Sequence, residues 1–325
     1  MDKVSIIIIA YNSASSLPKC IISCLNQTYK NIEIVIVIDG SPDNSFEVAK
    51  FYQKKDSRIL VINKENEGIP KTRKIGFDHS SGEFIYHLDA DDYIESNTIE
   101  VLLQRLYQED ADIVIGGLVF EDKNGKFITN WITSTTANSK VGYLKDIFKS
   151  RIPPFIFGRL IRREIFNSVF VPGNYNCGED FVSNIMMICY NSDIKIVSDP
   201  ALLHHYLIYE TSITNASKAE AFMIYTDDIC EILMNQNLEE SVINEWAYFR
   251  VIKSWRYYLR RGGKQYLRNK AYVRNFYNKY YSIIRSKLTI TERFELNLYR
   301  YNQFLGYNFS RVYSKILRIT NQPVN

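Results

Sequence analysis

The 325-residue sequence has few cysteines and histidines, five and four respectively, and it has no long apolar run. The cysteines form no Cys-x-x-Cys pair and have no clustered histidine partners, which argues against a disulfide framework and against a zinc site. No stretch reaches the roughly 18 to 20 apolar residues of a membrane span. The apolar run at residues 4–10 lacks the length, charged leader and cleavage site of a signal peptide. We therefore expect a protein of the reducing cytoplasm, free or peripheral to a membrane.

Apolar segments with the length of strands alternate with helix-like segments over the first 110 residues. The expected strands cover residues 4–10, 32–38, 59–62 and 83–88. Continuous apolar runs of this kind are typical of strands buried on both faces of a parallel sheet. The alternation predicts an α/β fold with a doubly wound, mostly parallel sheet, in which ligands bind beyond the carboxyl ends of the strands.

The pattern becomes mixed after the fourth expected strand. Asn97 and Glu100 have the spacing of a capping box at the start of a helix. A further strand is expected over residues 113–120, and a turn at Asn124-Gly125 leads to another over residues 127–131. The second part of the sheet is therefore expected to contain a hairpin.

The last third of the chain differs in periodicity and in charge. Only helical periodicity remains, over residues 218–234, 239–261, 264–287 and 291–318. Residues 250–325 hold 17 Lys and Arg against two acids, although the whole chain has a net charge of only +4. We expect two domains: an α/β body over residues 1–215, and a basic, tyrosine-rich, all-helical appendage over residues 216–325.

Three carboxylates follow the fourth expected strand within four positions. Asp89, Asp91 and Asp92 repel one another, and a divalent cation is the simplest reason to place them together at a strand end. Oxygen ligands suit Mg²⁺ or Mn²⁺, which share their remaining positions with water and substrate phosphates. The alternative is a solvated acidic loop that caps a helix. The first interpretation implies a phosphorylated substrate.

Two further polar groups are expected at the same edge of the sheet. Asp39 follows the second strand, where its carboxylate can accept hydrogen bonds from a base or a ribose hydroxyl, although Asp-Gly is also a common plain turn. Tyr11 follows the first strand and can stack on a base. Together they suggest a place for a nucleotide.

The order of these motifs resembles glycosyltransferase family 2. The motifs are Ser5-Ile-Ile-Ile-Ile-Ala-Tyr11-Asn12, Ile38-Asp39-Gly-Ser-Pro-Asp43, Asn66-Glu-Gly68 leading to Arg73, and Leu88-Asp-Ala-Asp-Asp92. The resemblance covers residues 4 to about 214 and implies an inverting, nucleotide-sugar-dependent enzyme with a GT-A fold. Ile38 is a departure, because many members have an aspartate there.

The resemblance also implies roles for individual residues. Tyr11 and Asp39 become contacts of the nucleotide base, and Arg73 a contact of the base or diphosphate. Asp89 is placed near the ribose and metal, and Asp91 becomes the main ligand of Mn²⁺ or Mg²⁺. The expected donor is a UDP-sugar.

A second pair of acids begins an expected helix over residues 180–189. Glu179 and Asp180 favour the first turn of a helix, so capping alone explains them. In the family, the aspartate of a matching Glu-Asp segment is the general base. The resemblance therefore makes Asp180 the base that deprotonates the acceptor hydroxyl, and Glu179 a residue that positions the acceptor.

Two adjacent histidines precede the expected domain boundary. His204 and His205 stand near a place where family members have residues that close over the diphosphate. The sequence leaves open which of the two histidines contacts the metal and which contacts the diphosphate. We take His204 as a metal ligand and His205 as a donor contact. The alternative is that both histidines are structural.

The sequence thus predicts a metal-dependent inverting glycosyltransferase that acts on a glycan or lipid-linked acceptor in cell-surface polysaccharide synthesis. The basic appendage favours a solvated helical face or an anionic membrane surface, with nucleic acid as a weaker candidate partner. Rival functions are sugar transfer to a polyprenyl phosphate, and nucleic-acid binding by a protein whose enzyme-like body is inactive.

Overall fold

The structure is a computed structural model that describes residues 2–135, 137, 139–167, 169, 171, 178–209, 228–229, 231–236, 238–248, 281, 284–302, 305–306, 308–309 and 312. The chain divides into two compact units, Met1–Ala216 and Ser217–Asn325. The first unit holds the sheet and is described first.

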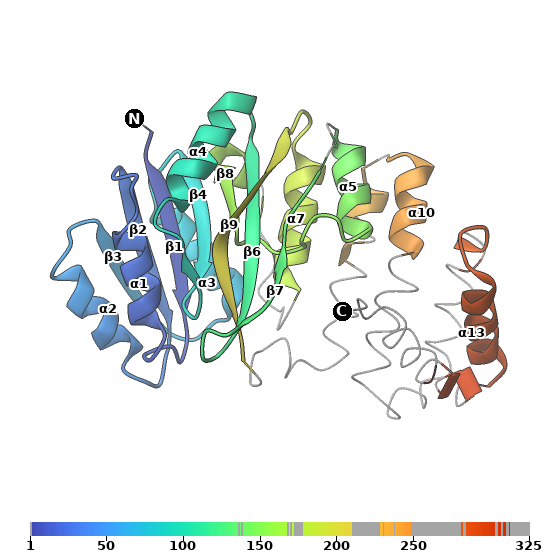
Figure 1. Ribbon diagram of the computed structural model, residues 1–325, viewed down its shortest axis with the longest axis horizontal. Coiled ribbons are helices and arrows are strands. Elements are labelled where there is room, and N and C mark those ends of the chain that lie inside the picture. The colour runs from blue at the N-terminus through green and yellow to red at the C-terminus, as the bar shows by residue number, and fades with distance from the viewer. Residues whose placement is uncertain are drawn as a thin grey trace. The chain divides into compact units, whose positions relative to one another are not determined.

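Four parallel strands form the first half of a nine-stranded sheet, in the order β3-β2-β1-β4 (Figure 1). They are β1 (Val4–Ala10), β2 (Ile32–Asp39), β3 (Ile59–Lys64) and β4 (Phe84–Asp89). The helices between them are α1 (Leu17–Leu25), α2 (Ser45–Gln53) and α3 (Ile69–Asp78), and α4 (Thr98–Glu109) follows. The predicted strands and parallel pairing are confirmed for this half. Ile9 pairs with both Val37 and Asp89, so the strand ends meet at one edge.

Helices cover both faces of this parallel half. One core cluster joins alternate residues of β1 and β2, such as Ile6 and Ile34, with Leu17 of α1 and Leu102 of α4. On the other face α3 approaches β1 so closely that a Cβ on Gly76 would lie 2.4 Å from Ile7. Each fully buried isoleucine contributes about 1.5–3 kcal/mol to stability, which explains why these runs are apolar at nearly every position.

The second half of the sheet is mixed. Strand β8 (Arg159–Arg162) runs antiparallel to β4 and to β6 (Ile113–Asp122), and β6 forms the predicted hairpin with β7 (Phe127–Trp131). The long strand β9 (Ile196–Ile208) lies parallel to β6 and antiparallel to β5 (Tyr93–Ile94). The sequence pattern does not indicate β9, which contains Pro200. Only about half of the sheet is therefore parallel.

Three helices accompany this half: α5 (Lys140–Phe148), α6 (Arg163–Phe166) and α7 (Glu179–Tyr190). The capping box predicted for α4 is wrong, because the Asn97 side chain makes no cap hydrogen bond. Glu100 instead accepts a hydrogen bond from Thr28 Oγ1 at 2.6 Å. A tertiary contact therefore replaces the local one.

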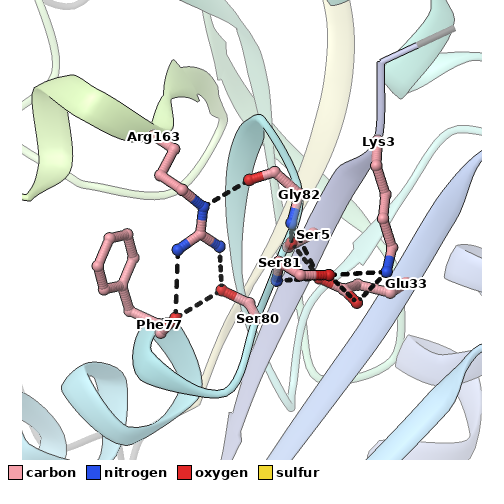
Figure 2. Close-up of polar contacts among 8 residues, drawn as sticks. All are labelled: Lys3, Ser5, Glu33, Phe77, Ser80, Ser81, Gly82 and Arg163. Atoms are coloured by element: carbon pink, nitrogen blue, oxygen red, sulfur yellow. Dashed lines mark hydrogen bonds and ion pairs between the residues drawn. The ribbon is translucent and has the colours of Figure 1, made fainter.

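Glu33 organises the amino-terminal edge of the sheet, opposite the expected site (Figure 2). Its carboxylate accepts hydrogen bonds from Ser5 Oγ at 2.6 Å, from the backbone N–H of Ser81, and from that of Gly82 at 3.1 Å, and it pairs with Lys3. Burial opposes its ionisation, but these donors outweigh burial and lower the pKa of Glu33 to about 2. Arg163 holds the same turn by donating to the carbonyl oxygen of Gly82. The interactions at this edge stabilise the fold.

The second unit is described only in part, and its described helices are α10 (Glu240–Tyr248) and α13 (Ile290–Tyr301). Helix α13 begins with a complete capping box between Thr289 and Glu292. Most of the basic helices expected over residues 218–234, 239–261 and 264–287 lies outside the described residues. Within the described part of the chain, no helix is both long enough and apolar enough to cross a membrane.

Candidate active site

Two loops at the carboxyl edge of the sheet are joined by Asp43. Its carboxylate accepts hydrogen bonds from the backbone N–H of Ala14 at 2.8 Å and from the hydroxyls of Ser41 and Ser45. Burial opposes ionisation, but these hydrogen bonds outweigh it and lower the pKa of Asp43 to about 2. The loop after β1 is thus fixed against the loop after β2. Tyr11 lies in the first of these loops, and half of its surface is exposed.

Asp39 fixes the loop that leads into α3. It accepts hydrogen bonds from the backbone N–H groups of Glu67 at 2.9 Å and Gly68 at 3.0 Å, and it pairs with Lys64. The next residue, Gly40, has a φ of +59°, and a Cβ there would lie 2.5 Å from the backbone nitrogen of Asn66. The backbone of this loop therefore requires both Asp39 and Gly40, independently of any ligand that Asp39 contacts.

Arg73 connects three carboxylates that are distant in sequence. Its guanidinium lies 3.0 Å from Asp180 Oδ1, 3.6 Å from Glu179 Oε1 and 3.8 Å from Asp89 Oδ1. The arginine comes from α3, the acids from α7 and β4. Its side chain is only 6% exposed, so these interactions are little screened by water. Burial lowers the pKa of Arg73, but Asp180 and the other acids outweigh burial and raise it.

Three of the carboxylates at this edge, Asp89, Asp91 and Glu179, resist ionisation. Burial, together with the neighbouring acids, raises the pKa of Asp89 to about 8 despite Arg73. Burial and Asp180 raise the pKa of Glu179 to about 7, and burial and Asp92 raise that of Asp91 to about 7. The ionised forms of Asp89, Asp91 and Glu179 would carry more negative charge than Arg73 alone balances, so a further cation would stabilise those forms.

A divalent cation fits this donor set. Asp89 and Asp91 are partly exposed carboxylates, and Mg²⁺ or Mn²⁺ is commonly held by one or two carboxylates together with substrate phosphates. Among the residues that the structure describes, no three acids, histidines or cysteines converge as a complete metal site. The two aspartates would therefore hold the ion jointly with the substrate.

Asp92 points away from this edge into the protein. It accepts a hydrogen bond from the backbone N–H of Leu207 at 3.0 Å, and its other oxygen lies 3.0 Å from Nε2 of His204. The second ring nitrogen of His204 lies 2.9 Å from the hydroxyl of Tyr86. His204 is fully buried, and burial lowers the pKa of its imidazole to about 3. Both of its nitrogens are engaged within the protein, which argues for a positioning role and against metal binding.

His205 lies on the opposite side of β9, because successive side chains of a strand alternate. Its ring nitrogens lie 2.8 Å from Glu95 Oε1 and 3.1 Å from Glu121 Oε1. The ring stacks on Tyr93 with 4.2 Å between the centroids. The structure thus groups His205 with these residues and does not bring it to Arg73, so the predicted donor contact stays a prediction.

Two buried residues at this site escaped the sequence analysis. Asn184 donates to the carbonyl oxygens of Pro154, Phe155 and Asp180, at 2.5, 2.9 and 3.0 Å. Arg159 donates to Oδ1 of Asn184 at 2.5 Å. These bonds attach the segment before β8 to the helix that carries Glu179 and Asp180. Asn184 lies one turn after Asp180, but no local pattern marks it.

The model of the family described as glycosyl transferase family 2 matches residues 5–170, slightly more than half of the chain. The chain belongs to glycosyltransferase family 2. It is 32% identical over 248 residues to the putative glycosyltransferase EpsH of Bacillus subtilis (strain 168), a match that covers 73% of this chain and 71% of EpsH. Glycosyltransferase GlyG of Streptococcus pneumoniae serotype 4 is 33% identical over 52% of this chain and 59% of its own length.

The family membership makes this chain a glycosyltransferase, as the sequence predicts. Its fold is that of the S. aureus TarS 1–349 crystal structure, with a TM-score of 0.72 over 99% of this chain and 93% of that one, at 18% identity. A TarS structure in complex with UDP-GlcNAc gives a TM-score of 0.69. The predicted GT-A fold class is therefore confirmed.

Proposed function

We propose that this family 2 enzyme is a metal-dependent inverting transferase that moves a sugar from a UDP-sugar to a hydroxyl of a glycan or lipid-linked acceptor in cell-surface polysaccharide synthesis. One observation carries the proposal. Arg73 joins Asp89, at the end of the strand that precedes Asp91, to Glu179 and Asp180, which begin a separate helix. The guanidinium of Arg73 thus contacts both Asp89, at the proposed metal-binding strand end, and Asp180, the proposed base.

Arg73 and Glu179 prepare the base. Arg73 lies 3.0 Å from Asp180 Oδ1 and fixes the position of this carboxylate, which can accept the proton of the acceptor hydroxyl. Glu179, whose pKa burial and Asp180 raise to about 7, is partly protonated at neutral pH and can donate a hydrogen bond to the acceptor. Asp180 lies at the head of α7, which Asn184 anchors to the segment at Pro154.

Asp89 and Asp91 would hold Mn²⁺ or Mg²⁺ together with the donor diphosphate. When bound, the ion supplies charge stabilisation to the departing nucleoside diphosphate. Tyr11 and Asp39 would contact the base, and His205 is retained as a candidate donor contact. The UDP-GlcNAc complex of TarS supports a UDP-sugar, and the complex of the Pyrobaculum calidifontis mannosyltransferase PcManGT with GDP-Man and Mn²⁺ (TM-score 0.58) supports a metal.

We also propose a domain boundary near residue 215. The basic appendage is proposed to associate peripherally with the inner face of the cell membrane. The charge of residues 250–325, with 17 basic residues against two acids, supports this membrane association. Vesicles with and without anionic lipid, sedimented with the full chain, test this part. Equal binding to both kinds of vesicle would contradict it.

A panel of UDP-, GDP- and dTDP-sugars tests the enzymatic proposal, with binding and slow hydrolysis measured in Mn²⁺ and in chelator. One UDP-sugar is expected to bind in a metal-dependent way. Asp91→Asn should abolish that metal dependence, and Asp180→Asn should abolish transfer while the donor still binds. Asp78→Asn, at an exposed acid paired with Lys74, is the matched control.

Two results would contradict the proposal. Turnover that survives both Asp91→Asn and Asp180→Asn would remove the metal and the base from the mechanism. Loss of transfer only in Asp91→Asn would favour a polyprenyl phosphate as acceptor, because an anionic acceptor needs no base.

A further inference from the structure

A stack of aromatic rings extends from the buried His204 to rings that are partly exposed. Phe157 stacks on His204 with 4.9 Å between the centroids, and on Phe155 with 4.7 Å. Tyr206 lies nearly parallel to both phenylalanines, at interplanar angles of 9°. Phe157 is 4% exposed, whereas Phe155 and Tyr206 are partly exposed and form the outer part of the stack.

Trp131 completes the outer part from the end of β7. Its ring meets Phe155 edge to face, with 6.3 Å between the centroids and an angle of 80°. Trp131 is also partly exposed. We call Trp131, Phe155 and Tyr206 the aromatic platform.

The platform is fixed beside the proposed base. Asn184, fully buried, donates from one amide group to the carbonyl oxygens of both Phe155 and Asp180. Arg159 holds Asn184 in turn and also donates to Pro153 at 2.8 Å. The backbone of Phe155 therefore cannot move independently of the first turn of α7.

Tyr206 brings the platform close to the acids of the site. The backbone N–H of the next residue, Leu207, donates to Asp92 Oδ1 at 3.0 Å, which holds this part of β9 against the acidic segment that follows β4. Carboxylates beside neutral rings repel an anionic acceptor. They suit a group with an apolar face and a rim of hydroxyls that donate hydrogen bonds.

We propose that Trp131, Phe155 and Tyr206 bind a pyranose ring of a neutral glycan acceptor, whose apolar face packs on the aromatic rings while its reacting hydroxyl meets Asp180. This inference rests on the proposed function and names its acceptor. In the transfer, the acceptor O–H proton passes to Asp180 and the oxygen bonds to the anomeric carbon of the donor. The bond from that carbon to the diphosphate breaks, and its electron pair leaves with the diphosphate.

Saturation-transfer NMR on the full chain tests the platform without a donor. The probes are methyl pyranosides of glucose, galactose, N-acetylglucosamine and rhamnose, with glycerol phosphate oligomers and farnesyl phosphate as competing classes. The ring C–H protons of at least one pyranoside should receive saturation from aromatic protons. Phe155→Ala and Trp131→Ala should each weaken this binding about tenfold, the loss of about 1.4 kcal/mol of ring contact.

Matched variants distinguish the loss of a ring contact with the pyranoside from a defect in folding. Phe155→Tyr keeps the ring and should keep the affinity, and Phe51→Ala removes an exposed ring from α2, far along the chain from the platform, and should change nothing. Binding of UDP with Mn²⁺, followed by calorimetry, reports on the donor side separately. In turnover, Phe155→Ala should raise the KM for the acceptor far more than it lowers kcat.

The outcomes are distinguishable. Pyranoside binding that is equal in Phe155→Ala and the wild type overturns the platform, and so does binding restricted to farnesyl phosphate or glycerol phosphate. If pyranosides bind through Phe155 but no UDP-sugar binds, the platform stands and the proposed donor is wrong.

Discussion

Glu33 offers a quantitative test of how the fold is held together. The substitution Glu33→Gln removes the negative charge and leaves the shape of the side chain. The contacts of Glu33 lower its pKa from an ordinary value of 4.5 to about 2. At about 1.36 kcal/mol per pKa unit, the ionised form contributes about 3 kcal/mol to the free energy of unfolding. The Glu33 side chain is 16% exposed, so water screens little of this contribution.

The sign of the pH dependence follows from the lowered pKa. Because the folded form holds the carboxylate ionised, this stability is fully present above pH 4.5 and is lost as the pH falls through 2. The same relation leaves about 1.4 kcal/mol at pH 3. Glu33→Gln should therefore cost about 3 kcal/mol at pH 7 and about half of that at pH 3.

Urea unfolding at both pH values, followed by hydrogen exchange of peptides from β1, β2 and β4, measures this cost in the first unit alone. Glu109→Gln is the matched control, since its surface pair with Arg105 should contribute less than about 0.5 kcal/mol. A cost for Glu33→Gln below about 1 kcal/mol at pH 7, or one that is equal at both pH values, would refute the reasoning.

Four further substitutions test the site. Arg73→Lys should lower kcat about 100-fold in steady-state assays, because an ammonium cannot span three carboxylates, and an unchanged kcat would remove Arg73 from the mechanism. Asn184→Ala should cost about 3 kcal/mol in urea unfolding, because buried carbonyl oxygens lose their donor and Arg159 loses one of its acceptors. A cost under about 1 kcal/mol would contradict this. His204→Phe should cost about 3 kcal/mol, because Asp92 Oδ2 and the Tyr86 hydroxyl lose their buried partner, whereas His205→Gln should cost less than about 1 kcal/mol. Equal thermal shifts in the two variants would argue against the buried role of His204.

Local chemistry made the first half of the fold predictable. The runs that form β1 to β4 are apolar at nearly every position, and only a strand covered on both faces needs that. Their ends carry Asp39 and Asp89 because a parallel sheet brings its carboxyl ends to one edge. The cluster at Asp89 and the order of the motifs along the chain were therefore readable without coordinates.

Other features could not be read in this way. The Asn97–Glu100 spacing fits a capping box, but in the structure Glu100 accepts a hydrogen bond from Thr28, which is distant in the sequence. His204 and His205 are neighbours in sequence, and the sequence does not distinguish which of them contacts a ligand. Only the pairing of β9 with β5 shows that one faces buried Asp92 and the other faces Glu95.

The sequence by itself determined the parallel half of the sheet, its acidic edge and the family, because each rests on residues close together in the chain. Only the tertiary structure decided which acids lie together. Arg73 and Asp180 are more than 100 positions apart, and their 3.0 Å contact depends on α3, β4 and α7 meeting at one edge. The physical reason is that a buried guanidinium needs carboxylates in space, and their separation along the chain is immaterial to that need.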